Sequence, residues 1–233
     1  MIGFETVSLG TGGVAPCVRC TAESLAPLDF DVILPSLTAA AHMGAGGVIL
    51  AGTEPFAHPS LVEIIGAARA LEVPRIGVQT DGSALALGQN AAGSVSAGVR
   101  FFEFVFLGGN AESHDRAVGR SGAFSSLLAG VSAVKRAASP DRRVFVAGVV
   151  RLCPHTVGGF VPAVSAAVSA GVRSVRVEST PGLDLPRAAV DQAHAIATTA
   201  GVALFGDGCD HLLMGARLYE MSPAKSGSEV AGG

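Results

Sequence analysis

Residues 144–150 read VFVAGVV, an unbroken apolar run without a charged side chain. Such a strand is typical of a parallel sheet buried on both faces, because a sheet with one face in water alternates apolar and polar residues. Six other runs rich in apolar or β-branched residues recur along the chain. The expected strands are Phe4–Leu9, Gly47–Ala51, Arg75–Thr80, Phe101–Leu107, Val144–Leu152, Val172–Glu178 and Val202–Phe205.

Stretches rich in Ala, Leu and Val, with apolar residues at helical spacing, lie between these runs. They predict helices over 28–43, 58–72, 83–97, 116–137, 157–170 and 185–200. Strand and helix therefore alternate six times, and a further short strand follows. Because right-handed crossovers curl such units into a barrel, we predict an α/β fold of the partial (β/α)6 TIM-type barrel kind. A flat doubly wound sheet is the competing arrangement.

The size and composition of the chain suit one domain. Its 233 residues are 49% hydrophobic, which is enough to bury a large core. We expect a single domain over residues 1–221 and a disordered tail over 222–233, where small and polar residues predominate.

Charge and hydropathy exclude several classes of partner. The net charge of −3 and the absence of a Lys or Arg run argue against nucleic acid. The most apolar long stretch, residues 33–50, contains Pro35, His42 and three glycines, so it does not predict a membrane span. The first residues lack the positive segment of a secretory signal, and a cytoplasmic location is the default expectation.

Two short segments at strand ends indicate a site. Cys17 and Cys20 form a Cys-x-x-Cys pair in a Gly-rich stretch after the first expected strand, and cysteines in a cytoplasmic chain are more typical of thiols or metal ligands than of disulfides. Gly52-Thr53-Glu54-Pro55 ends the second expected strand and places a carboxylate on a tight turn. Glu54 would either receive a ligand ammonium or stabilise the turn by accepting backbone N–H bonds.

The second of these segments resembles a turn of the radical S-adenosylmethionine (SAM) enzymes, whose Gly-Gly-Glu-Pro turn holds the SAM amino group. The residues that follow, PFAHPSLVEIIGAARALEVPRIGVQTDGSAL (55–85), are similar to the family's His-Pro, helix, strand and Thr-Asn-Gly passage. NAESHDRAVGRSGAFSSLLAGVSAVKRA (110–137) resembles the Glu-x-His-Asp passage of members that modify peptides or build cofactors. The resemblance covers roughly residues 4–180 and implies a partial barrel. It also implies SAM bound at Gly52, Thr53 and Glu54, and an iron–sulfur cluster.

Two departures from the family pattern fall on its cofactors. The family's cluster motif is Cys-x3-Cys-x2-Cys; Cys17 and Cys20 match its second and third cysteines, whereas Gly13 stands at the first. Glycine offers no donor, so this loop alone does not hold a four-iron four-sulfur cluster with one iron open to SAM. In the fourth expected strand, Phe106-Leu107-Gly108-Gly109 replaces the family's Ser-Leu-Asp-Gly, whose polar side chains help hold the SAM ribose. The coincident losses favour a degenerate member.

The remaining cysteines offer another set of metal ligands. Cys153 and Cys209 follow the fifth and seventh expected strands, and on a barrel all four cysteines then lie at one mouth. They would make a site for zinc or an iron–sulfur cluster from Cys17, Cys20, Cys153 and Cys209, with His155 or His211 as substitutes. Alternatively, Cys153 and Cys209 are small buried hydrophobes, as free cysteine often is.

Two histidines near the resemblance motifs are interpreted as structural. His58 precedes Pro59 at an expected helix start, where a capping or packing role is expected. His114-Asp115 has the composition of an acid–base dyad, but sequence neighbours point in different directions and Asp115 suits a helix N-terminus, so capping is expected here too.

Two classes of function follow. The favoured one is a degenerate radical-SAM-like barrel that acts as a non-catalytic partner or subunit, binding a peptide or an active homologous enzyme in peptide or cofactor maturation. The alternative is a radical SAM-type iron–sulfur enzyme whose cluster is completed by Cys153 or Cys209. Because Gly13 replaces one cluster cysteine, the sequence leaves open whether the chain is an enzyme, and it assigns no catalytic residue.

Overall fold

A computed structural model of the chain describes residues 3–10, 26–52, 54–139 and 141–206. Seven strands form one sheet in the order β1-β2-β3-β4-β5-β6-β7, and each strand is parallel to its neighbours. Their bounds are β1 Phe4–Ser8, β2 Gly47–Ala51, β3 Ile76–Thr80, β4 Val99–Phe106, β5 Phe145–Leu152, β6 Ser174–Ser179 and β7 Ala203–Gly206. The order in the sheet is the order in the sequence, so each crossover joins adjacent strands.

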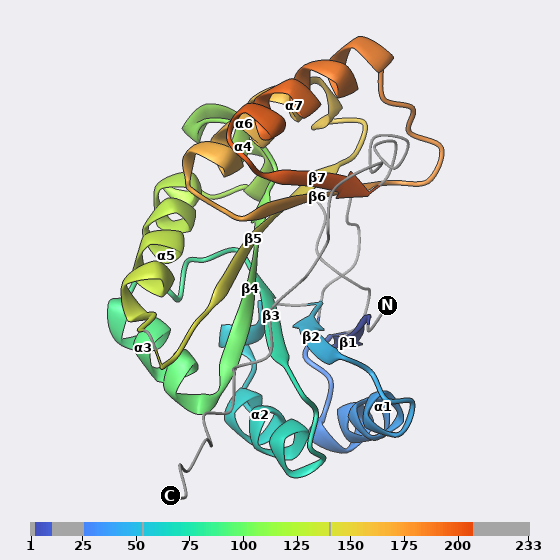
Figure 1. The fold of residues 1–233 in the computed structure, drawn as a ribbon, viewed down its shortest axis with the longest axis vertical. Helices are drawn as coiled ribbons and strands as arrows, with labels where there is room; N and C mark the ends of the chain where they lie inside the picture. The colour runs from blue at the N-terminus through green and yellow to red at the C-terminus, as the bar shows by residue number, and fades with distance from the viewer. Residues whose placement is uncertain (1–2, 11–25, 53, 140, 207–233) are drawn as a thin grey trace, which may run out of the picture.

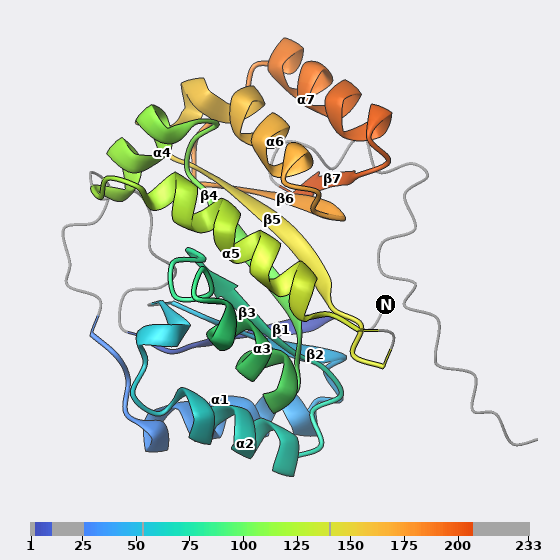
Figure 2. The same ribbon diagram turned by 90° about the vertical axis from the view of Figure 1, so that its left-hand side faces the viewer.

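The helices cover the outer, convex side of this curved sheet (Figures 1 and 2). They are α1 Phe30–His42, α2 Leu61–Ala70, α3 Gly88–Ala97, α4 Ala111–Val118, α5 Ala123–Ala137, α6 Phe160–Ser169 and α7 Arg187–Thr199, with 3-10 turns η1 Pro55–Ala57 and η2 Val157–Gly159. β1 and β7 are the two edges of the sheet, which is therefore an open half-barrel. The predicted partial TIM-type barrel is confirmed, and the flat doubly wound alternative is wrong because the helices do not cover both faces.

One predicted helix is two helices in the structure. The sequence predicts a single helix over 116–137, but α4 ends at Gly119 and α5 begins after Gly122, with φ of 76° and 77° at the two glycines. Backbone in this left-handed region terminates an α-helix. The helix predicted from residue 83 begins only at Gly88, because Asp81 Oδ1 accepts a hydrogen bond from the Ser83 amide at 2.7 Å and holds a turn there.

Several sequence predictions fall outside the described residues. These are the positions of Cys17, Cys20, Thr53, Cys209 and His211, and the tail at 222–233. Among the helices that the structure describes, none combines the length and hydropathy needed to cross a membrane.

The two faces of the sheet carry different side chains. On β4, Phe102, Phe104 and Phe106 face the helices and belong to the main core, together with Val146 and Val150 of β5. On the inner face, the rings of Phe4, Phe101 and Phe145 stack in series with centroids 5.0 Å apart, beside Ile49, Ala51 and Ala147. The N-terminal end of the barrel interior is thus filled by an apolar layer, and polar side chains are left to the part nearer the C-terminal ends of the strands.

Helix α5 packs so closely on the loop after β3 that it has no room for a side chain at one position. A Cβ at Gly130 would lie 2.5 Å from the carbonyl oxygen of Gly82. At Gly66 on α2, by contrast, a Cβ would have nothing within 4 Å.

These two helical glycines give a matched pair of variants. Gly130→Ala should lower the free energy of unfolding by about 2 kcal/mol, because the backbone of the β3–α3 loop must move away. Gly66→Ala should raise it by about 0.5–1 kcal/mol, because alanine is the better helix former and meets no neighbour. Urea unfolding of both variants measures the two values; a stabilising Gly130→Ala would show that α5 does not pack against this loop.

Candidate functional site at the strand ends and in the barrel interior

The carboxylate of Glu54 ties the C-terminal ends of β2 and β3 together. Its Oε1 accepts hydrogen bonds from Thr80 Oγ1 at 2.7 Å and from the Phe56 amide at 3.3 Å, and its Oε2 accepts one from the Asp81 amide at 2.8 Å. The turn-stabilising role, one of the two predicted for Glu54, is confirmed by these bonds.

Burial raises the pKa of Glu54 from its ordinary 4.5 to about 7, and the negative charge of Asp81 adds to the rise. The hydrogen bonds from Asp81, Thr80 and Phe56 act in the opposite direction. A cation beside Oε2 would favour the ionised form. An ammonium-binding role for Gly52, Thr53 and Glu54 is therefore chemically consistent with the turn and stays a prediction.

The end of β4 is packed too tightly to hold a ligand through side chains. Phe106 is fully buried and Leu107 nearly so. A Cβ at Gly109 would lie 2.4 Å from the backbone of Pro162, and one at Gly108 would lie 2.6 Å from the His114 amide nitrogen. Gly109 stands where the radical SAM pattern also has glycine, but Gly108 stands where the pattern has aspartate, and the approach of α4 leaves no space there for that side chain.

His114 and Asp115 do not form a dyad. The His114 ring is buried, its Nδ1 accepts a hydrogen bond from the Leu107 amide at 3.2 Å, and burial lowers the pKa of His114 to about 4. Asp115 accepts hydrogen bonds from the amides of Gly122 at 2.6 Å and Phe124 at 2.8 Å, and the latter is the main cause that lowers the pKa of Asp115. The predicted capping role is confirmed, although Asp115 caps the following helix, α5.

His58 also has a structural role. Its Nε2 lies 2.9 Å from the Leu28 carbonyl oxygen, and its Nδ1 accepts a hydrogen bond from the Ser60 amide at 3.1 Å. The ring therefore joins the segment before α1 to the start of α2, and the predicted capping and packing role is confirmed.

Cys153 lies in apolar packing at the C-terminal ends of β4 and β5. It is 2% exposed and packs with Leu107 and Ala117, and its Sγ is 3.5 Å from Thr156 Oγ1. This is the environment of a small buried hydrophobe. Among residues 3–10, 26–52, 54–139 and 141–206, no group of three or more His, Cys, Asp or Glu side chains is arranged to hold a metal.

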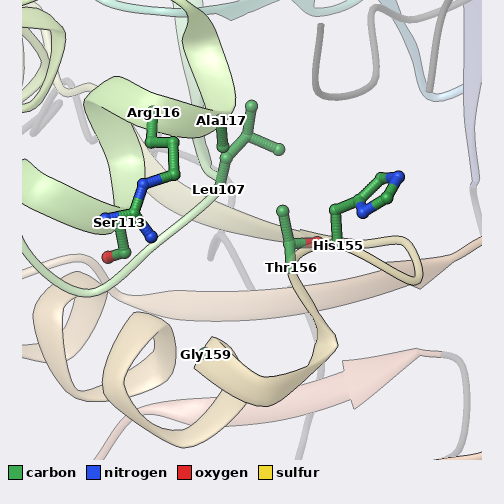
Figure 3. A pocket seen from close by; sticks show the side chains of 7 residues that line it. All are labelled: Leu107, Ser113, Arg116, Ala117, His155, Thr156 and Gly159. Carbon is green, nitrogen blue, oxygen red and sulfur yellow. The ribbon is translucent and has the colours of Figure 1, made fainter. Parts of the chain in front are cut away.

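A shallow pocket of about 90 Å³ opens beside Cys153 (Figure 3). Ser113, Arg116 and Ala117 of α4 line one side, and His155, Thr156 and Gly159 line the other. The His155 ring points away from Arg116 and Ser113 (Figure 3). Arg116 is already paired with Glu112 at 2.5 Å, so this pocket presents little unpaired charge to a ligand.

The barrel interior holds a feature that the sequence analysis missed, a closed ring of hydrogen bonds among polar side chains of four adjacent strands. We call it the polar ring; its members are Gln79 of β3, Glu103 of β4, Arg151 of β5, and Arg176 and Glu178 of β6.

Each member of the polar ring contacts two others. Gln79 donates through Nε2 to Glu103 at 2.9 Å and accepts at Oε1 from Arg151 at 2.9 Å. Arg151 donates to Glu178 through Nε at 2.9 Å and Nη2 at 2.5 Å. Arg176 donates to Glu103 through Nε at 3.3 Å and Nη2 at 2.7 Å, and closes the ring through Nη1 to Glu178. A glutamine suits its place because it alone among these residues both donates and accepts.

The polar ring is electrically balanced. Two guanidinium groups face two carboxylates, and burial of Arg176 would lower its pKa but is outweighed by Glu103 and Glu178, so the pKa is raised. A buried charge costs several kcal/mol unless it is paired and hydrogen-bonded, and here the described contacts supply both conditions.

The signal for this ring is present in the sequence but subtle. Each member lies in an otherwise apolar strand, at positions that alternate with core residues: Glu103 lies between Phe102 and Phe104, and Arg176 between Val175 and Val177. A polar residue at inward-facing positions of four successive strands predicts a polar barrel interior, once the strands are known to be parallel neighbours.

No protein-family model matches the sequence, and no curated protein matches it. Solved structures match the fold. SuiB of Streptococcus suis has a TM-score of 0.64 at 10% identity over 90% of this chain and 50% of SuiB, and it has been solved bound to S-adenosylmethionine and to the precursor peptide SuiA. This chain therefore spans about half the length of SuiB.

Two other solved structures are similar. Methylornithine synthase, PylB, has a TM-score of 0.57 at 13% identity over 88% of this chain and 71% of PylB. The protein anSMEcpe, with bound AdoMet and Kp18Cys peptide, has a TM-score of 0.58 at 11% identity over 87% of this chain and 63% of its own. The open half-barrel is thus the fold of radical SAM enzymes, and identities this low establish the fold alone.

The raised pKa of Glu54 predicts a pH-dependent stability. Below pH 4.5 the carboxyl is protonated in both the folded and the unfolded state, and between pH 4.5 and about 7 the unfolded state ionises first. The stability of the wild type relative to Glu54→Gln should therefore fall by up to about 3 kcal/mol across this interval and stay constant above it. Urea unfolding at a series of pH values measures the difference.

Glu63→Gln is the matched control, because Glu63 is an exposed carboxylate on α2. Its difference from the wild type should stay flat over the same interval. A flat difference for Glu54→Gln as well would show that the Glu54 carboxylate is not buried at the turn that follows β2.

Proposed function

We propose that this chain is a radical-SAM-like barrel that does not cleave SAM reductively and serves as a non-catalytic partner or subunit, binding a peptide or an active homologous enzyme in peptide or cofactor maturation. In this proposal the barrel provides a binding surface, and the chemistry belongs to the partner. The partner is neither a nucleic acid nor a membrane, in keeping with the net charge of −3, and the expected location is the cytoplasm.

The observation that carries the proposal is the packing at the end of β4. Gly108 stands where the radical SAM pattern has aspartate, and it meets α4 so closely that a Cβ there would lie 2.6 Å from the His114 amide nitrogen. Restoring that aspartate would require α4 to move. The absence of this ribose-holding side chain is therefore fixed by the packing of the barrel, and a single substitution would not restore it.

The cluster residues support the same reading. Gly13 supplies no thiolate where the radical SAM pattern has its first cysteine, and Cys153 is 2% exposed among apolar side chains. The residues present do not fit an open-iron cluster, so we derive no step through one. Cys17 and Cys20, with Cys209 as a further thiolate in place of the apolar-packed Cys153, remain a proposed site for zinc, and Gly52, Thr53 and Glu54 a proposed site for the ammonium end of SAM.

Peptide binding is supported by the inner face of the barrel and by the similar structures. The polar ring places guanidinium and carboxylate groups on the inner face, and SuiB and anSMEcpe have each been solved with a peptide. A peptide carries donors, acceptors and charged side chains of both signs, which suits such a surface.

Catalysis is tested by adding back the missing ligand. After anaerobic reconstitution with iron and sulfide and addition of SAM and a strong reductant, the wild-type chain should form no 5′-deoxyadenosine. Gly13→Cys should gain iron and sulfide and still form little product, because the end of β4 is unchanged. Repeated turnover by the wild-type chain would overturn the proposal.

The alternative, an enzyme whose cluster is completed by Cys153, is tested by Cys153→Ser. We expect unchanged iron and zinc content and a loss of about 1–3 kcal/mol in the free energy of unfolding, because a hydroxyl replaces a thiol in apolar packing. Cys17→Ser, measured in parallel, reports whether any bound metal depends on the Cys-x-x-Cys pair. A stoichiometric metal that disappears in Cys153→Ser would establish the alternative.

A further inference from the structure

The atoms of the polar ring divide into two complete pairs and one link. Glu103 receives Nε and Nη2 of Arg176, and Oε2 of Glu178 receives Nε and Nη2 of Arg151. Arg176 reaches both oxygens of Glu103, which is the strongest geometry for a guanidinium and a carboxylate, whereas Arg151 places two donors on the single oxygen Oε2 of Glu178. What remains is Nη1 of Arg176 and Oε1 of Glu178, and these two atoms form the link that closes the ring.

The link is also the part of the ring nearest to solvent. The side chains of Arg176 and Glu178 are 30% and 26% exposed, whereas those of Glu103 and Arg151 are 5% and 9% exposed. Opening the link would leave each deeper group with its two-point partner, so no buried charge would lose its counterion. The deeper pairs would cost much more to break, because each separation would strand a buried charge.

A buried polar atom without a partner lies on the same strand. Ser174 is 3% exposed, and its Oγ has no hydrogen-bond partner among the residues that the structure describes. Ser174 alternates with Val175 and Val177 of the helix-facing core, so it shares the inner face with Arg176 and Glu178. A buried hydroxyl without a partner is unfavourable, and a ligand group on the inner face would satisfy it.

We propose that the polar ring opens at the Arg176–Glu178 link to bind a group that carries a carboxylate and a cation side by side. The ligand carboxylate takes the place of Glu178 on Nη1 of Arg176, and the ligand cation takes the place of Arg176 on Oε1 of Glu178. A ligand with one charge leaves either Nη1 of Arg176 or Oε1 of Glu178 without a hydrogen-bond partner, so both charges are required. The proposal rests on the proposed function only in placing a ligand inside the barrel.

Two sources carry this chemistry, a free α-amino acid and a peptide with neighbouring acidic and basic side chains. Calorimetry with L-alanine, which carries both charges, and with its singly charged analogues L-alanine amide and N-acetyl-L-alanine tests the first source. The blocked peptide acetyl-Gly-Glu-Lys-Gly-amide, against its Gln-Lys and Glu-Gln analogues, tests the second. The probe that carries both charges should bind at least tenfold more tightly than its singly charged analogues.

The variant that reports on the site is Glu178→Gln, which keeps an acceptor for Arg151 and removes the charge that receives the ligand cation. It should weaken binding of the doubly charged probe at least tenfold, and Glu63→Gln, an exposed carboxylate on α2, should leave it unchanged. Arg176→Lys keeps a positive charge beside Glu103 but loses the planar guanidinium whose nitrogens contact Glu103 and the ligand at the same time, so it should weaken binding as well. Side-chain 15N signals should shift on binding for Arg176 in the wild type.

Binding of either doubly charged probe that depends on both of its charges, on Glu178 and on Arg176 supports the proposal. The probe that binds identifies the source as a free amino acid or a peptide. Binding that Glu178→Gln does not change, equal binding of singly charged analogues, or no binding of either probe would overturn it. These outcomes are separate from the SAM-cleavage assay, because a barrel that forms 5′-deoxyadenosine and still binds the probe refutes only the proposed function.

Discussion

The interior of this half-barrel depends on the pairing of Arg176 with Glu103 across β5. The two residues lie on strands that are not adjacent. Glu103 pairs in register with Ala147 of β5 and Arg176 with Val149, so the guanidinium must reach diagonally across β5 past these two side chains. A larger residue at Ala147 would separate the pair and leave Glu103 buried with a neutral amide as its remaining described partner. The other contacts of the polar ring, from Gln79 to Arg151 and from Arg151 to Glu178, are arranged around this one.

The polar ring costs more desolvation free energy than an apolar interior would. Replacing a buried ion pair by apolar residues of similar volume is often neutral or stabilising, so charged groups in a barrel interior require a reason other than stability. Near the N-terminal ends of the strands the same interior is apolar, and the rings of Phe4, Phe101 and Phe145 stack with centroids 5.0 Å apart. The change from aromatic stacking to a balanced polar ring along the barrel axis is what we expect where a fold keeps a binding site. The end of β4, by contrast, is filled by Phe106, Leu107 and helix backbone. Fold and chemistry are thus separable, as they are in other widespread barrels.

The sequence predicts the sheet well because the strands are predominantly apolar on the face toward the helices and are bounded by glycine or charge. The predicted strand Val144–Leu152 begins one residue before β5 and ends with it, and Gly47–Ala51 is the observed β2. The join between α4 and α5 is missed because the Ala-rich stretch contains Gly119, which ends α4, and Gly122, which precedes α5. The positive φ angles of these glycines are set by the packing around them and cannot be read from the sequence. The capping roles of His58 and Asp115 are predictable from their neighbours. The polar ring is not, because its contacts join residues 72 and 73 positions apart. Arg151 in VVRL looks like the polar end of a strand until the strand order places Gln79 and Glu178 beside it.

The most direct test of the account is a pair of double-mutant cycles on Arg176, made with Gln substitutions and measured by urea unfolding. One cycle couples Arg176 to Glu103, and the other couples Arg176 to Glu178. The account predicts a coupling free energy of about 2 kcal/mol or more for the buried two-point pair with Glu103. For the partly exposed link between Arg176 and Glu178 it predicts a coupling free energy of less than about 1 kcal/mol. A coupling to Glu178 as large as the coupling to Glu103 would show that the polar ring is a single rigid structural network, and would contradict the account of it as a binding site that opens.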